Sequence, residues 1–457
     1  MWSGIVYSYS LNNYQYNNYS MPKTNRITSS EKSDTKVITP YVSSNVIKNV
    51  PYNPAFTSTI RTELISDDEK NKYAELTKIL DKNSRKDLNI LLRNGILLNS
   101  DSNDKTTTLD NLYKIATTPR AQGLDNLTTL RDTINTLINP HLVTQQFGNI
   151  PKEYYQRVQE LGKGGDVNVD HSGTCPAASI EFNLAQKHPA EFARFAQGLS
   201  SPSMSVEKTI KLNNLADNTL DAIWLLNAFE IPFEAKDFNE AKLKFAPDNN
   251  AIVRAHIQTV DKDKSERSSV DVLMQSTFMQ IGSQQSYNTL TDTREGKFNQ
   301  NPKGLIEFEK TFAESVVEDK NTISVTYQKV DDNARLIGYE TDFNTIKKQI
   351  TDTLKSGKNV IIGYTQVDNT NTIVNGHEIT IIGAKENRNG KLTFICHDTD
   401  DGVSRAVEYS EDYLIPKIHH AGLPQEIVKD EMDITENWVE GLKTYKELKK
   451  QNLKNAA

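Results

Sequence analysis

The chain of 457 residues contains only two cysteines, Cys175 and Cys396. Two thiols are too few for the disulfide framework of a small secreted domain. No run of about 18 consecutive apolar residues occurs, so the sequence predicts no membrane span. The opening residues, Met-Trp-Ser-Gly-Ile-Val-Tyr, lack a basic region followed by an apolar stretch, which is the pattern of a classical secretion signal. We therefore expect a cytoplasmic protein, or one exported without a classical signal peptide.

The chain also lacks an excess of positive charge. The formal net charge is −7 at pH 7, and lysines and arginines do not gather into a stripe along any segment. Proteins that follow a phosphate backbone need such a stripe, because neutralised phosphates supply most of their affinity. We therefore expect neither nucleic acid nor a membrane among the partners of this chain.

Residues 1–60 have little hydrophobic periodicity. Their tyrosines alternate with asparagine and serine, and scattered prolines follow. Such a segment buries too little apolar surface to compensate for the entropy of ordering the chain. We expect a disordered N-terminal arm, and docking of its tyrosines on a partner protein is the alternative role for it.

Residues 61–160 show helical periodicity and are predicted to form a small helical bundle. Ser66 and Glu69 have the spacing of a capping box at the start of the first helix. Gly95 is placed to cap the end of the second helix, and Pro119 and Pro140 end two further apolar stripes. The bundle contains no catalytic constellation, and its role stays open between inhibition, an adaptor function and structural support.

Residues 161–425 contain helical patterns first and strand patterns later, which is the order expected of an α+β domain. Helical stripes precede residue 320, and alternating or continuous apolar runs at 323–327, 360–367 and 391–398 predict strands. Residues 426–457 are predicted to form a final C-terminal helix. The chain is therefore predicted to be an α+β protein with an added helical region.

The stretch Gly-Thr-Cys175-Pro-Ala-Ala-Ser places a rare thiol where a helix pattern begins. Pro176 suits the first turn of a helix, whose N–H groups have no partner inside the helix. Those groups and the positive end of the helix dipole lower the pKa of a thiol and activate it as a nucleophile. The backbone N–H of Cys175 is also a natural donor to an oxyanion.

A base and a carboxylate are predicted on a hairpin near the end of the domain. His377 opens an apolar strand, and a turn around residues 388–389 leads to a strand that ends at Asp398. A hairpin with this turn places His377 opposite a residue near 400, so Asp398 and Asp400 both can share its face. A carboxylate there would orient the imidazole, and Asp398 is our first choice over Asp400.

The segments GTCPAAS, NGHEITIIG and FICHDTDDG, in this order, resemble the papain-like cysteine peptidase superfamily. The likeness is greatest to compact bacterial members, such as the bacteriocin-processing peptidases, and covers mainly residues 165–185 and 340–405. The resemblance implies a papain-like domain in which a nucleophile helix packs beside an antiparallel sheet. It also implies that Cys175 is the nucleophile, His377 the general base and acid, and Asp398 the residue that orients the imidazole.

One position departs from that family. An oxyanion glutamine usually stands about six residues before the cysteine, where this chain has Val169. Asn168, His171 and Ser172 are the possible substitutes, and Asn168 is the best amide donor among them. The expected function is a cysteine peptidase that cleaves peptide or isopeptide amides of a protein or peptide substrate. A transglutaminase-like acyl transferase and a catalytically inactive papain-like binding protein are the alternatives.

No cofactor or metal is expected. His397, Asp398, His419 and His420 offer ligand atoms, but none of them has the helical spacing of a zinc protease motif. His419 and His420 are neighbours, and consecutive residues of a regular strand point to opposite faces of the sheet. Cys396 alternates within a strand and is expected to be buried.

Overall fold

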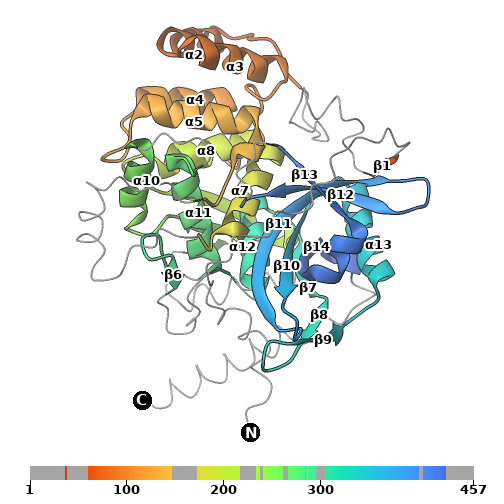
Figure 1. Cartoon of the computed structure of the whole chain (residues 1–457). Coiled ribbons are helices and arrows are strands. Elements are labelled where there is room, and N and C mark those ends of the chain that lie inside the picture. The colour runs from red at the N-terminus through yellow and green to blue at the C-terminus, as the bar shows by residue number, and fades with distance from the viewer. Residues whose placement is uncertain are drawn as a thin grey trace, which may run out of the picture.

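The computed structural model describes residues 36–38, 60–146, 172–216, 233–236, 240–260, 266–283, 285–294, 304–305, 307–400 and 405–428. Within these residues the chain is a mixture of helices and antiparallel strands, as expected of an α+β protein. A helical part and a large sheet lie side by side, and the first helices stack on the helical part at the end away from the strands (Figure 1).

The region predicted as a helical bundle is helical. Its elements are α2 (Asp67–Ile79), α3 (Lys82–Arg93), α4 (Thr108–Thr117), α5 (Asn126–Ile138) and the short 3₁₀ helix η2 (Pro140–Leu142). The predicted capping box is present, because the Ser66 hydroxyl accepts from the N–H of Glu69 and the Glu69 carboxylate accepts from the N–H of Ser66. Gly95 follows α3 with a φ of +73°, a conformation that favours glycine.

Five further helices carry most of the predicted apolar stripes of the next region. They are α7 (Cys175–Lys187), α8 (Pro189–Leu199), α10 (Ala251–Val260), α11 (Ser269–Gly282) and α12 (Glu307–Glu318). Leu76 and Leu112 of the bundle belong to the same buried cluster as Ala177 of α7 and Phe278 of α11. The helical region therefore shares its hydrophobic core with the helix that carries Cys175.

The large sheet is antiparallel throughout and has the order β13-β12-β11-β10-β14-β7, with β1 added beside β11. Its strands are β1 (Lys36–Ile38), β7 (Thr322–Thr326), β10 (Val360–Val367), β11 (Ile373–Glu386), β12 (Leu392–Asp398), β13 (Val407–Ser410) and β14 (Ile418–Pro424). The strands predicted at 323–327, 360–367 and 391–398 are thus confirmed within one or two residues.

Helices cover both faces of this sheet (Figure 1). On one face α13 (Phe343–Lys355) contributes Ile350 to a buried cluster with Ile362 of β10 and Ile379 of β11. On the other face Ile361 of β10 belongs to the cluster of Ala177 and the helical part. The start of α7 is thereby fixed beside the strand that carries His377.

Several elements had no counterpart in the sequence predictions. A small antiparallel sheet has the order β2-β4-β3, and two further strand pairs are β5-β6 and β8-β9. Their bounds are β2 (Val206–Lys211), β3 (Phe233–Lys236), β4 (Glu240–Phe245), β5 (Tyr287–Asn288), β6 (Thr293–Arg294), β8 (Gln328–Val330) and β9 (Leu336–Tyr339). The remaining short helices are η3 (Leu212–Asn214), α14 (Glu411–Leu414), η4 (Ile415–Lys417) and α15 (Gln425–Val428).

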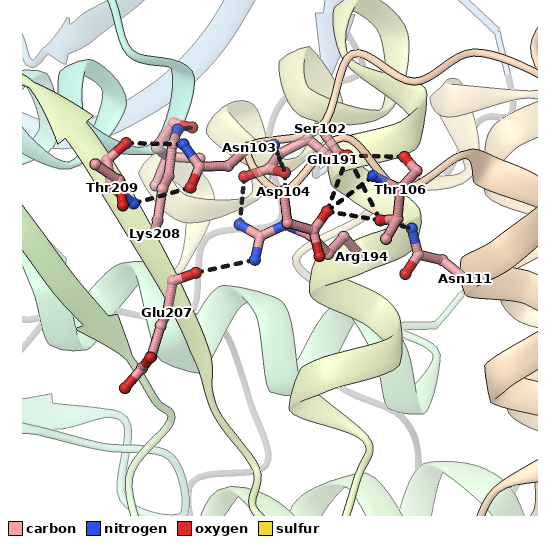
Figure 2. A network of polar contacts seen from close by, with 11 residues as sticks. Ser102, Asn103, Asp104, Thr106, Asn111, Glu191, Arg194, Glu207, Lys208 and Thr209 are labelled. Carbon is pink, nitrogen blue, oxygen red and sulfur yellow. Dashed lines mark hydrogen bonds and ion pairs between the residues drawn. The ribbon is translucent and has the colours of Figure 1, made fainter.

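A polar network joins the loop before α4 to α8 and β2 (Figure 2). Arg194 forms a two-point ion pair with Glu191, with both N–O distances at 2.7 Å, and donates to the carbonyl of Glu207 at 2.9 Å. The N–H of Asn103 donates to Glu191 at 2.9 Å, while its side chain exchanges two hydrogen bonds with the backbone of Thr209. The network therefore ties the helical region to the rest of the fold at a buried charge pair.

Three predicted segments fall largely outside the described residues. Of the arm at 1–60, the structure describes residue 60 and Lys36–Ile38, which pairs with β11 as the strand β1. The boundary at residue 160 lies within 147–171, and the helix predicted at 426–457 lies beyond residue 428 apart from the end of α15. These three predictions stay predictions.

Among the helices that the structure describes, none is both long enough and apolar enough to cross a bilayer.

The buried charge pair makes a testable contribution to stability. Replacing Arg194 by Met leaves the Glu191 carboxylate buried without its cation, which costs about 3–5 kcal/mol in comparable cases. Chemical unfolding in urea should show this loss. Lys70→Met is the matched control, because Lys70 pairs with Asp67 at the exposed surface and its loss should cost less than about 1 kcal/mol. Equal effects of the two variants would contradict the assigned role of the network.

Candidate active site

Cys175 is the first residue of α7, as predicted, and Pro176 follows it in the first turn. The side chain of Cys175 is largely buried, and the residue is 6% exposed. The N–H of Cys175 has no acceptor inside the helix, because it belongs to the first turn. The thiol and this N–H therefore lie at the positive end of the helix dipole.

His377 and Asp398 lie together on neighbouring strands of the predicted hairpin. Ile379 of β11 pairs with Asp398 of β12, so the same register places residue 400 opposite His377. The Nε2 atom of His377 is 2.8 Å from Oδ1 of Asp398, and both residues are buried. The predicted register and the first choice of carboxylate agree with this geometry.

The thiol of Cys175 lies beside the His377 ring and the backbone N–H of Glu378, and both stabilise its anion. Because Nε2 of His377 faces Asp398, the ring turns its other nitrogen, Nδ1, toward the sulfur. A continuous line of contacts therefore runs from the start of α7, through the imidazole on β11, to the carboxylate at the end of β12.

Burial and charge act in opposite directions on these three groups. Burial dominates at the Cys175 thiol and raises its pKa, although His377 and the N–H of Glu378 stabilise the anion. The lowered pKa expected of a thiol at the start of a helix is therefore not found. Burial lowers the pKa of His377, but the Asp398 charge and hydrogen bond outweigh it and raise that pKa well above its usual value. For Asp398, burial is likewise outweighed by His377, which lowers the carboxyl pKa to about 2. Asp398 thus favours the protonated imidazole, which is the form that results when the thiol gives its proton to the ring.

Asp398 has two further partners that fix its carboxylate. The hydroxyl of Tyr409 on β13 donates to Oδ2 at 2.7 Å, and the N–H of Asp400 donates to Oδ1 at 3.1 Å. The Asp400 carboxylate instead accepts from the side chain of Gln146 at 2.6 Å. Asp400 therefore supports Asp398 through its backbone, and its side chain is engaged elsewhere. Nothing in the sequence around Tyr409 identified it in advance.

The loop before Cys175 is held by residues from far along the chain. The N–H of Gly173 donates to Asp292 at 2.6 Å, and the hydroxyl of Thr174 donates to the amide oxygen of Gln275 at 2.7 Å. Asp292 also accepts from the Tyr287 hydroxyl at 2.8 Å and has a φ of +53°. Asp292 and Gln275 therefore hold the loop that leads into Cys175, and no sequence pattern singled them out.

The described residues contain some of the candidate donors to an oxyanion. Asn168 and His171 lie in 147–171, outside the described residues. The Ser172 hydroxyl lies 2.5 Å from the Thr174 hydroxyl and accepts from the Thr174 N–H, so it is used within the loop. The N–H of Cys175 is the donor that the described residues offer.

The other residues weighed for chemistry lie apart from this line of contacts. Cys396 is fully buried in β12, and both cysteines are free thiols. His397 stacks on Phe182 at 4.1 Å between ring centres, and its Nε2 lies 3.0 Å from the carbonyl of Val143. Burial lowers the pKa of His397 well below its usual value, which suits a neutral packed ring.

His419 and His420 do not follow the sequence expectation. Their Nδ1 atoms lie 3.1 Å apart, whereas consecutive residues of a regular strand point to opposite faces. In the part of the chain that the structure describes, these histidines and Glu307 form the one group with the spacing of metal ligands.

Comparisons with models of protein families, with curated proteins and with solved structures gave no match for this chain.

The shifted carboxyl pKa predicts how stability depends on pH. A folded pKa of about 2 for Asp398, below the value of about 3.9 in an unfolded chain, gives stability that is present above pH 4. This part, on the order of 2 kcal/mol, is lost as the pH falls from 4 to 2. Asp398→Asn removes this pH-dependent contribution. The difference in unfolding free energy between wild type and variant should therefore shrink as the pH falls from 4 to 2. The exposed Asp332→Asn serves as control, and a constant difference for Asp398→Asn would contradict the assignment.

Proposed function

We propose that this protein is a thiol hydrolase of the cysteine peptidase type, with an arrangement like that of papain-like enzymes. The observation that carries the proposal is the line of contacts from Cys175 through His377 to Asp398. Two distant parts of the chain, the start of α7 and the β11–β12 hairpin, supply these groups, and the proposal gives each group the role that the chemistry requires. A buried histidine that merely fills a core needs neither a thiol on one side nor a carboxylate on the other.

The geometry supports a two-step acyl transfer to water. Nδ1 of His377 accepts the proton of the Cys175 thiol, and the thiolate attacks the carbonyl carbon of the amide. The N–H of Cys175 stabilises the oxyanion that forms. His377 then donates its proton to the leaving amine, which departs and leaves an acyl-enzyme. In the second step His377 takes a proton from water while the water oxygen attacks the acyl carbon. The carbon–sulfur bond then breaks, the acid departs, and His377 returns the proton to the Cys175 sulfur.

Asp398 acts on the orientation and charge of the imidazole. Its carboxylate accepts from Nε2 of His377, which keeps Nδ1 free to exchange a proton with sulfur. Tyr409 and the N–H of Asp400 hold the carboxylate in this position. We propose protein or peptide chains as substrates. Cleavage of an amide needs a nucleophile, a group that protonates the leaving amine and a donor to the oxyanion, and this site offers all three.

Hydrolysis of a fluorogenic peptide library tests the proposal. Cys175→Ala should abolish turnover of any cleaved peptide, and His377→Gln should lower kcat/KM by about 10²–10⁴-fold because it removes the general base and acid. Cys396→Ala is the matched control, since it removes the other thiol, which is buried in β12, and should retain the activity. Cleavage that survives Cys175→Ala would refute the mechanism.

Adding a primary amine to the same assay separates hydrolysis from acyl transfer. Release of the free acid supports the hydrolase. A product in which the amine is joined to the acyl group would instead show that the protein is a transglutaminase-like transferase. Binding of a peptide to wild type and to Cys175→Ala alike, with no turnover by either, would instead assign a binding protein.

A further inference from the structure

A second group of side chains that bind protons or metals lies where β14 meets the start of α12. Oε1 of Glu307 is 3.2 Å from Nδ1 of His419, and that nitrogen is 3.1 Å from Nδ1 of His420. One ligand atom from each of the three residues lies within 4.8 Å of the others. Both histidines are buried, while the Glu307 side chain is 22% exposed, which leaves a route from solvent.

A β-bulge explains why two consecutive histidines converge. Gly363 of β10 pairs with His420, but the next residue, Tyr364, pairs with Ile418. His419 is therefore an extra residue on β14 without a partner position on β10. Bulges redirect side chains in this way and are frequent at functional sites. The two rings lie nearly perpendicular, at 86°.

Glu378 fixes the orientation of His420. Its Oε1 is 2.7 Å from Nε2 of His420, and this carboxylate favours a proton on Nε2, which leaves the lone pair of Nδ1 toward His419. Gly363 stands between the two residues, and a Cβ there would lie 2.2 Å from the His420 ring and 2.8 Å from Glu378. A glycine is therefore needed at 363 for this carboxylate–histidine contact to form.

Hydrogen bonds alone do not explain why Oε1 of Glu307 and the Nδ1 atoms of His419 and His420 lie so close together. His419 Nδ1 faces the lone pair of His420 on one side and a carboxylate oxygen of Glu307 on the other. A single N–H at this nitrogen can be well aligned with only one of them, or is shared between both as a three-centre bond. A cation accepts lone pairs from all three atoms at once.

We propose that Glu307, His419 and His420 bind a zinc ion. Two imidazoles and a carboxylate are a common zinc ligand set that leaves a fourth position for water. Zinc–ligand bonds of about 2.0–2.2 Å in a tetrahedron place neighbouring ligand atoms about 3.3 Å apart, close to the two distances found here. A carboxylate behind a ligating histidine, as Glu378 is, is the usual support of such sites.

The zinc site and the nucleophile are connected through Glu378. Its carboxylate contacts His420, and its backbone N–H lies beside the Cys175 thiol and stabilises the thiolate. Zinc bound to His420 would fix the orientation of its ring. Because Glu378 contacts this ring, the zinc ion would also stabilise β11, which carries His377. The site is a structural support for the active site and takes no part in the chemistry proposed above.

Metal binding is best measured in full-length Cys175→Ser, because a reactive thiol beside a histidine binds zinc on its own. Titration of the metal-free protein with Zn²⁺ should give one equivalent of tight binding and a rise in Tm. Titration with Co²⁺ should give the intense visible absorption of a four-coordinate ion. Absence of both signals in this protein would overturn the proposal without affecting the proposed hydrolase.

Variants assign the ligands. Glu307→Gln and His419→Gln should each weaken binding by more than about 100-fold, and Glu378→Gln by about 10–100-fold, since it only orients His420. His141→Gln is the matched control, because His141 and His397 also face each other through Nδ1 atoms, at 3.2 Å, with no third ligand among the groups of the described residues. Unchanged affinity in Glu307→Gln and His419→Gln, or equal loss in the control, would refute the assignment.

Discussion

The candidate site depends on one contact, the one between Nε2 of His377 and the carboxylate of Asp398 across the β11–β12 hairpin. It fixes which nitrogen of the ring faces the thiol, and it stabilises the charged form of an imidazole for which burial alone favours the neutral form. The hairpin register, the hydroxyl of Tyr409 and the N–H of Asp400 all serve to hold this carboxylate. Without it the thiol of Cys175 would be an ordinary buried cysteine.

Two consecutive residues of β11 give the strand two roles. His377 contacts the thiol and Asp398, while the side chain of Glu378 contacts His420 on β14. The backbone N–H of Glu378 also contacts the sulfur, so the nucleophile and the proposed zinc site share one peptide unit. From the helical side, Asp292 and Gln275 hold the loop before Cys175. The surroundings of Cys175 are thus built from the helical part and from the sheet, and the helical part shares its core with α2–α5.

Local signals account for what could be predicted from the sequence. Helices α2–α5 and α11 have clear apolar stripes and N-terminal caps, α7 begins with Pro176 in its first turn, and the turn near residue 388 fixed the hairpin register to within about two residues. That register was enough to place Asp398 beside His377. Contacts such as Gly173 with Asp292 join residues over a hundred positions apart, and no periodicity encodes them. The convergence of His419 and His420 was missed because it depends on a bulge, which breaks the alternation that strand predictions assume.

The most direct test of the account is the rate at which iodoacetamide alkylates Cys175 as a function of pH, located by mass spectrometry. The account predicts that His377 makes the thiol more reactive. At neutral pH the wild type should react at least about ten times faster than His377→Gln, whose rate should rise only at higher pH. Cys396, fully buried, should stay unmodified in both proteins. Equal rates for Cys175 in the two proteins across the pH range would contradict the claim that this cysteine and histidine act together.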